Sequence, residues 1–285
     1  MPSDITISKG RIYAPWCRPP NASRYMVGSI HDDAVAQDLG FRNGLVSSTV
    51  LVELFPPLIL EFFGERWFEQ GSISFYFPIP IVEGDEVRAV MGLPPKSAND
   101  VQVEAWVERR DGQRIADGTI AVGNPPELSA LRARKLDRYD HGEPHLLAGV
   151  KAGDQIPWID VALTKEDADF RASTVTELLS WLQRDWPWGA PPVIMRNMIQ
   201  TMVIPAMTHL KRQREEGIPI YGAVEIRNVH GPMKVEHPYR GGGTILYVGT
   251  SPKTEYLWYD SDLQEKDGTT VAQLRMMLRF MKLRS

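Results

Sequence analysis

The chain has 285 residues, of which 43% are hydrophobic and 24% are charged, as in a soluble globular protein with a sizeable core. Its formal net charge of -4 argues against nucleic acid as a partner, because phosphate binding needs a basic surface. The single cysteine, Cys17, excludes an internal disulfide and fits a reducing compartment. Since no basic and then apolar leader opens the chain, we expect a cytoplasmic protein.

The first half of the chain predicts an early strand, one long helix and four later strands. Residues 5–14 are expected to form the early strand, and residues 49–63 an apolar helix kinked at Pro56-Pro57. Glu53 and Glu61 within that apolar run argue against a membrane span. Alternating apolar residues predict the remaining strands, at 72–77, 86–91, 101–110 and 114–122.

Residues 124–157 are rich in proline, glycine and charge and lack a sustained apolar period. This composition predicts a linker that packs over the surface. We expect its basic residues to be a solvated face, which comprises Arg132, Arg134, Lys135 and Arg138.

The second half repeats the pattern of the first. A strand is expected at 158–163, and Thr164 is expected to cap a short helix, with Asp167 in the capping-box position. Residues 192–211 predict the long helix of this half. Further strands are expected at 221–229, 244–249, 255–262 and 270–281.

Two pairs of glycines suggest that the halves arose by duplication. Gly84 and Gly242 follow similar proline-led segments, and Gly112 and Gly268 each stand in an Asp-Gly dipeptide between strand-like runs. Asp-Gly between alternating segments is a strong hairpin signal. The two pairs have nearly the same separation along the chain, so a turn and a hairpin recur in the same order.

The segment IHDDAVAQDLGFRNGLVSS, at 30–48, and the following SISFYFPIPIVEGDEVRAV resemble the MaoC-like hydratases and dehydratases of the hotdog fold. The resemblance implies an α+β double hotdog, in which two antiparallel sheets, joined edge to edge, each wrap around a long central helix. It divides the chain into a catalytic N-terminal hotdog (1–123), the linker (124–157) and a non-catalytic C-terminal hotdog (158–285) that helps to form the substrate tunnel.

His31 occupies the position of the family histidine, which would serve as the acid or base. The aspartate and asparagine that precede it in the family are replaced here by Met26 and Gly28. At the start of the central helix the family His-Gly pair is replaced by Ser47-Ser48. The resemblance implies that the Ser48 backbone amide holds the thioester carbonyl and that Ser47 adds a hydroxyl donor. The same serines would also suit a helix N-cap.

Further residues near these positions are candidates for substrate binding. In the first half they are Tyr25, Met26, Asp32 and Phe41. In the second half Arg196 and Asn197 stand where the family would have His-Gly. Arg196 either pairs with a substrate carboxylate or phosphate or extends to the surface. His31 itself is either the catalyst or an ordinary solvated or core histidine.

The resemblance therefore implies a lyase that reversibly hydrates the enoyl group of an acyl thioester, presented by coenzyme A or a carrier protein. The missing aspartate leaves two alternatives open: a proton-transfer enzyme (isomerase, cyclase or dehydratase) acting on a substrate without coenzyme A, or a non-catalytic acyl-binding subunit. A thioesterase would use Glu53. We expect no cofactor and no metal, since His230 and His237 lack a third ligand. No membrane partner is expected, and a homodimer is possible.

Overall fold

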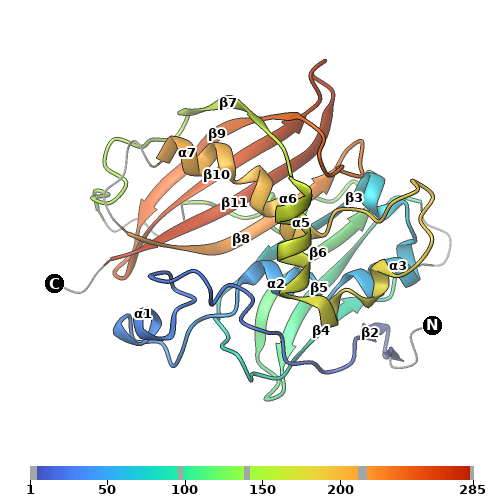
Figure 1. The fold of residues 1–285 in the computed structure, drawn as a ribbon. Coiled ribbons are helices and arrows are strands. Elements are labelled where there is room, and N and C mark those ends of the chain that lie inside the picture. Colours follow the sequence, from blue (N-terminus) through green and yellow to red (C-terminus); the bar gives the residue numbers. More distant parts are fainter. Residues whose placement is uncertain (1–4, 96–98, 138–141, 211–216, 283–285) are drawn as a thin grey trace.

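A computed structural model describes residues 5–95, 99–137, 142–210 and 217–282. Within these residues the strands form one antiparallel sheet of 11 strands, in the order β1-β2-β4-β5-β6-β3-β8-β11-β10-β9-β7. The six strands from the first half and the five from the second meet where β3 pairs with β8. The helices lie on one side of this sheet (Figure 1).

The first half contains six strands and four short helices. Its strands are β1 (Thr6–Ser8), β2 (Arg11–Tyr13), β3 (Gly71–Tyr76), β4 (Val87–Gly92), β5 (Val101–Arg109) and β6 (Arg114–Val122). Its helices are α1 (Asp33–Asp38), α2 (Ser48–Val52), α3 (Pro56–Phe63) and α4 (Trp67–Gln70).

The second half contains five longer strands and three α-helices. The strands are β7 (Gln155–Val161), β8 (Ile218–Asn228), β9 (Tyr239–Thr250), β10 (Thr254–Gln264) and β11 (Thr270–Met281). The helices are α5 (Lys165–Ser173), α6 (Met195–Met202) and α7 (Ile204–Leu210), with two 3-10 turns, Thr176–Leu178 and Ser180–Leu182, between α5 and α6. Among the residues described, no helix combines the length and the apolar character that crossing a membrane requires.

This repeated unit of helices wrapped by an antiparallel sheet confirms the α+β double hotdog expected from the sequence. The predicted hairpins are confirmed as well, since Gly112 and Gly268 adopt φ angles of 84° and 89° in the β5–β6 and β10–β11 turns. Thr164 caps α5 as predicted, because its hydroxyl accepts a hydrogen bond from the Asp167 amide at 3.1 Å.

The predictions of one kinked helix over 49–63, of one continuous helix over 192–211 and of one early strand are wrong. In the first half α2 ends at Val52 and α3 begins at Pro56, because proline has no N–H to continue the helical ladder. In the second half α6 ends at Met202, and Pro205 stands in the first turn of α7. Residues 5–14 form a hairpin, since Lys9 and Gly10 turn the chain at positive φ (48° and 71°).

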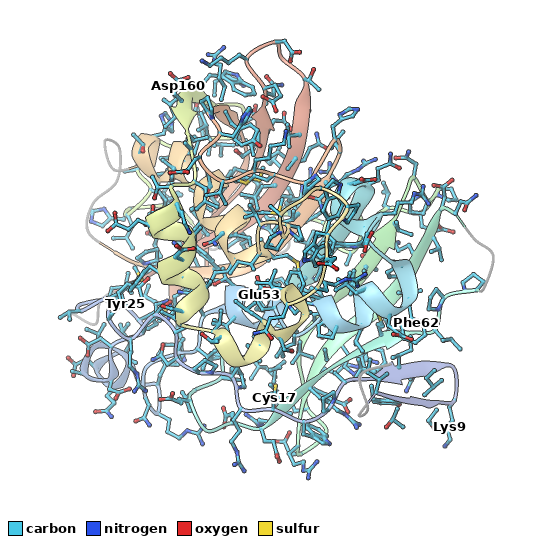
Figure 2. The ribbon with its side chains drawn as sticks, turned by 45° about the vertical axis from the view of Figure 1, so that its right-hand side comes forward. Lys9, Cys17, Tyr25, Glu53, Phe62 and Asp160 are labelled. Atoms are coloured by element: carbon cyan, nitrogen blue, oxygen red, sulfur yellow. The ribbon has the colours of Figure 1, made fainter. Side chains whose placement is uncertain are left out.

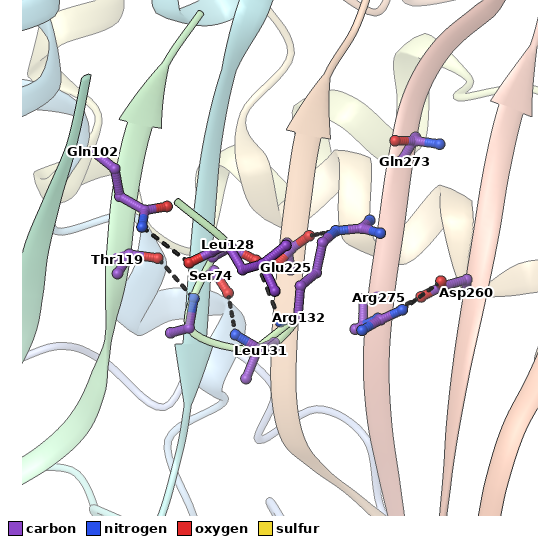
Figure 3. Close-up of polar contacts among 12 residues, drawn as sticks. Ser74, Gln102, Thr119, Leu128, Leu131, Arg132, Glu225, Asp260, Gln273 and Arg275 are labelled. Atoms are coloured by element: carbon purple, nitrogen blue, oxygen red, sulfur yellow. Dashed lines mark hydrogen bonds and ion pairs between the residues drawn. The ribbon is translucent and has the colours of Figure 1, made fainter. Parts of the chain in front are cut away.

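The linker crosses the outer face of the sheet, over the seam between β3 and β8 (Figure 3). Its anchor is Glu225 of β8, which is only 1% exposed. This carboxylate accepts hydrogen bonds from the Ser129 hydroxyl and from Arg132 Nε, the latter at 2.7 Å. On β3 the Ser74 hydroxyl accepts the Leu131 amide at 3.0 Å.

The expectation of a solvated basic face is therefore wrong for two of its members. Arg132 pairs with the buried Glu225, and Arg134 lies over the ring of Tyr76, 3.7 Å from its centroid. Arg138 lies outside the described residues. Further along, the buried Glu255 accepts the amides of His145 and Leu147 at 2.8 and 2.9 Å. The linker is thus part of the packed structure.

We expect Glu225→Ala to lower the free energy of unfolding by about 2–3 kcal/mol, because Arg132 and Ser129 lose a buried acceptor. Asp260→Ala is the matched control on the same face, where Asp260 pairs with Arg275 at 2.8 Å but is 34% exposed. That change should cost about 1 kcal/mol or less. Urea denaturation of the two variants checks this, and equal losses would contradict the role assigned to Glu225.

Candidate active site

The loop that carries His31 is held against the segment that leads into α2. The Leu45 amide donates to the Ile30 carbonyl at 3.0 Å, and Asn21 Nδ2 donates to the His31 carbonyl at 2.8 Å. Gly44 allows this approach, since a Cβ at that position would overlap the carbonyl oxygen of His31. The backbone of His31 is therefore fixed relative to the start of α2.

The imidazole of His31 is oriented by a second contact with the same segment. His31 Nδ1 lies 2.7 Å from the Leu45 carbonyl oxygen. Because a carbonyl only accepts, Nδ1 carries the proton and Nε2 keeps its lone pair. Burial lowers the pKa of His31, and the charge of Arg196 adds to that effect, while the bond to Leu45 opposes it. The ring is thus favoured in its neutral form.

Ser47 and Ser48 stand at the start of α2 and have different surroundings. Ser47 is the N-cap, and its hydroxyl accepts the Thr49 amide and lies 2.8 Å from the Thr49 hydroxyl. Ser48 is the first helical residue, and its buried hydroxyl has no hydrogen-bond partner in the described part of the chain. The backbone amides of a first helical turn have no acceptor within their own helix.

His31 and both serines line a cavity of about 650 Å³ between the two halves. Met26 and Phe41 contribute apolar surface from the first half, and the second half contributes residues of α6, α7 and β8. Three basic residues also line it: Arg171, Lys253 and Arg279. Among the described lining residues there is no aspartate or glutamate. Most of the cavity lining is therefore apolar, and its charged side chains are basic.

Two candidates from the first half lie beside this cavity and do not line it. Asp32 caps α1, and its carboxylate accepts the amides of Ala34 at 3.0 Å and Gly28 at 3.2 Å. Tyr25 is 47% exposed, and its ring contacts Phe170 of α5 edge to face, with centroids 5.0 Å apart. Figure 2 shows Tyr25 at the periphery of the molecule. Both residues shape the loop before His31.

Arg196 and Asn197, the candidates from the second half, are buried at the start of α6 and do not line the cavity. The Arg196 guanidinium donates to the Ala22 carbonyl, the Ser23 hydroxyl and the Thr174 hydroxyl, each at 3.2 Å. Asn197 Nδ2 donates to the Ala168 carbonyl at 3.3 Å. Arg196 therefore ties the loop that leads to His31 to the second half of the chain.

Glu53 is buried in the interior of the molecule (Figure 2) and faces the start of α6. Its Oε1 accepts the Arg196 amide at 2.7 Å, whereas its buried Oε2 has no partner among the described residues. Burial raises the pKa of Glu53 to about 7, against the opposing effect of the backbone amides and the charge at the start of α6. The carboxylate occupies an amide at this helix start, which disfavours attack by Glu53 on a thioester bound there.

Tyr221 and Gln200 are cavity residues that the sequence analysis did not single out. Tyr221 belongs to β8, and the polar Gln200 side chain of α6 lines the same cavity and acts to lower the pKa of this phenol. Burial raises the pKa of Tyr221 to about 12. Because α6 also contains Arg196, Asn197 and Thr201, Gln200 did not stand out in the sequence as a signal for this pair.

Other groups considered from the sequence lie elsewhere. Burial, with the nearby Glu86, raises the pKa of the Cys17 thiol to about 11, so the nucleophilic thiolate is scarce. The His237 ring pairs with Glu265 at 2.7 Å. Within the described ranges no three histidine, cysteine, aspartate or glutamate side chains gather in a group that could hold a metal.

No family model and no curated protein matches this sequence. Among solved structures, the chain is similar to a conserved hypothetical protein from Mycobacterium tuberculosis described as having a double hotdog fold, with a TM-score of 0.62, 12% identity and 97% of each chain covered. A putative MaoC domain protein dehydratase from Chloroflexus aurantiacus gives a TM-score of 0.60 at 10% identity, covering 96% of this chain and 94% of the other.

A third structure, described as a MaoC-like dehydratase, gives a TM-score of 0.55 at 16% identity, with 94% of this chain and 97% of the other covered. The likeness extends over nearly the whole length of each chain. At these identities it establishes the double hotdog fold.

The raised pKa of Glu53 predicts a pH-dependent stability. Between its ordinary value of 4.5 and about 7, the folded protein holds a proton that the unfolded chain has lost. This contribution is complete below pH 4.5 and disappears as the pH rises through 7. We therefore compare the free energies of unfolding of Glu53→Gln and wild type. The difference, variant minus wild type, should be roughly 3 kcal/mol larger at pH 8 than at pH 4.5, because each pKa unit corresponds to about 1.4 kcal/mol.

Denaturation curves of wild type and Glu53→Gln across this pH range provide the measurement. Glu61→Gln, an exposed glutamate of α3, is the matched control and should keep the wild-type pH dependence. A parallel pH dependence in wild type and Glu53→Gln would rule out Glu53 as the source.

Proposed function

We propose that this chain is a hotdog enzyme that reversibly adds water to the double bond of a 2-enoyl thioester, with His31 as the general base. The observation that carries the proposal is the setting of His31. Its Nδ1 is bound to the Leu45 carbonyl, its pKa is lowered by burial, and it lines the cavity between the halves. A neutral imidazole with a free nitrogen can accept a proton from water as the water attacks carbon 3.

The Ser48 backbone amide is the proposed donor to the thioester carbonyl. It is the first residue of α2 and lines the same cavity as His31. A hydrogen bond to this oxygen stabilises the negative charge that develops when water adds to the conjugated double bond. The Ser48 hydroxyl, which is buried without a partner among the described residues, is not needed for this role.

The lining also supports an acyl thioester as the substrate class. Apolar side chains such as Phe41, Val203 and Met207 suit an acyl chain. Arg171, Lys253 and Arg279 add positive charge without a lining carboxylate to offset it. Coenzyme A and the phosphopantetheine arm of a carrier protein are both anionic, and either would be favoured by this charge.

One observation favours a second candidate function. The described cavity lining contains no carboxylate to act beside His31, as the hydration chemistry of the resembled family would require. A reaction that needs a single base, such as isomerisation of an anionic substrate without coenzyme A, fits this lining. A purely acyl-binding role would also leave the cavity as it is.

His31→Ala should lower the hydration rate of enoyl-CoA thioesters by a factor of about 10²–10⁴, the usual contribution of a general base. The assay follows the loss of enoyl thioester absorbance for short, medium and long acyl chains. His230→Ala is the matched control, because His230 is exposed and bonds the Thr270 carbonyl outside the cavity. Wild-type protein that turns over none of these thioesters would refute hydration and favour the second candidate.

The lowered pKa of His31 predicts the acidic limb of the pH profile. Because the base acts in its neutral form, kcat/KM should be constant near neutral pH and fall about tenfold per pH unit below a pKa lower than 6.5. Steady-state kinetics between pH 4.5 and 8 measure this limb. An apparent pKa above 6.5 would contradict a base buried as His31 is.

A further inference from the structure

A cavity that holds a base without a carboxylic acid raises the question of which group protonates carbon 2. Hydration needs a proton at carbon 2 after water has added to carbon 3. Serine and threonine hydroxyls in the described lining are very weak acids. Lys253 is an exposed side chain in the turn between β9 and β10. Tyr221 is a partly buried phenol in the same lining.

A β-bulge turns Tyr221 toward the cavity. In β8, Ala223 pairs with Met277 and Tyr221 pairs with Leu278, so Gly222 is an extra residue on this strand. Ala223 and Met277 belong to a cluster on the outer face, whereas Tyr221 packs against the main core together with Leu278. Without the bulge, Tyr221 would lie on the same face as Ala223, because side chains two residues apart share a face.

The extra residue of the bulge, Gly222, lies close to two side chains of β11 and is tied to the seam between the halves. A Cβ at Gly222 would lie 2.6 Å from Arg279 Nε and 2.9 Å from Met277 Sδ. The Gly222 carbonyl accepts the Phe77 amide at 2.9 Å, just beyond the end of β3. Bulges beside active sites commonly redirect a side chain in this way.

The surroundings of Tyr221 keep it a proton donor. The Gln200 side chain lines the same cavity and acts to lower the pKa of Tyr221. Desolvation raises the pKa of Tyr221, while the positive charges of Arg196 and Arg171 act in the opposite direction and would stabilise a transient phenolate. Arg196 also acts electrostatically on His31, so both groups lie within the influence of one buried cation.

We propose that Tyr221, positioned by Gln200, is the catalytic acid that protonates carbon 2 of the substrate, opposite His31; this inference rests on the proposed function. As the water oxygen bonds to carbon 3, His31 Nε2 takes a proton from that water, and the π electrons of the carbon 2–carbon 3 bond move to the enolate. The Tyr221 O–H then gives its proton to carbon 2. The phenolate recovers a proton from the His31 imidazolium through solvent, so one water is added in total.

The test compares wild type, Tyr221→Phe and His31→Ala in two assays. One is hydration of enoyl-CoA, and the other is exchange of the carbon 2 protons of butyryl-CoA in D₂O, followed by NMR. Tyr221→Phe should lower both rates by a factor of about 10²–10⁴ through kcat, with KM within a few-fold of wild type. Tyr259→Phe is the matched control, because Tyr259 is a buried tyrosine of β10 whose hydroxyl contacts Met276 Sδ at 3.1 Å.

Each outcome separates this inference from the proposed function. If Tyr221→Phe keeps hydration and exchange within twofold of wild type while His31→Ala loses hydration, Tyr221 is not the acid and the proposed function stands. A second outcome is that wild type hydrates no thioester but exchanges carbon 2 protons, and that Tyr221→Phe loses this exchange. Tyr221 would then be the group that transfers the carbon 2 proton, although the protein is not a hydratase. Absence of both activities in wild type overturns both proposals.

Gln200→Leu provides a second variant if Tyr221→Phe fails to fold. It removes the polar side chain that acts to lower the pKa of Tyr221 and leaves the phenol in place. We expect a loss of about tenfold in kcat and an altered basic limb of the pH profile, which a merely structural change would not produce. Wild-type kinetics in a folded Gln200→Leu protein would count against the positioning of Tyr221.

Discussion

The antiparallel pairing of β3 with β8 determines how the two halves of this protein face each other. Five residue pairs, from Ser72 with Arg227 to Tyr76 with Ala223, join the strands. Because the pairing makes one sheet of two, the helices of both halves lie on the same side of it. The cavity forms between them, with His31 and Ser48 from one half and Gln200 and Tyr221 from the other. A site shared in this way requires the seam to be rigid.

Equivalent positions after the starts of α2 and α6 carry different residues with different contacts. Glu53 stands five residues after the first residue of α2, and Gln200 stands five residues after the first residue of α6. Glu53 turns to the opposite helix and accepts the amide of Arg196. Gln200, a neutral amide in the equivalent place, lines the cavity together with Tyr221. The Glu53 carboxylate therefore binds at the start of α6, whereas Ser48 at the start of α2 lines the cavity.

Local signals along the chain were enough to predict the repeated architecture. The Asp-Gly turns and the Thr164 cap depend on neighbouring residues only, and the structure contains them as predicted. The breaks in both central helices were underestimated, although Pro56 and Pro205 are visible in the sequence, because apolar periodicity continues across them. Alternation predicts a strand but not an extra residue within it, so the bulge at Gly222 could not be foreseen.

The site was predicted less completely than the fold, for a related reason. His31, Ser47 and Ser48 lie close together in the sequence and meet again in the structure. Arg196 and Glu53 come from distant segments, and their burial and mutual contact arise only when the halves pack together. Tyr221 enters the cavity through the register between β8 and β11, which is a property of strand pairing.

The anchoring of the linker has a consequence for how the molecule loses its structure. Ser129 and Arg132 precede the second half in the chain, yet their partner Glu225 lies within it. The linker also bonds the first half, since the amides of Ala130 and Leu131 donate to the Thr119 and Ser74 hydroxyls. Separating the two hotdogs would therefore break one of these two sets of contacts, in addition to exposing the β3 and β8 edges. Partial opening along the seam is therefore costly, and the two halves are bound to melt together, as one cooperative unit in spite of their duplicated design.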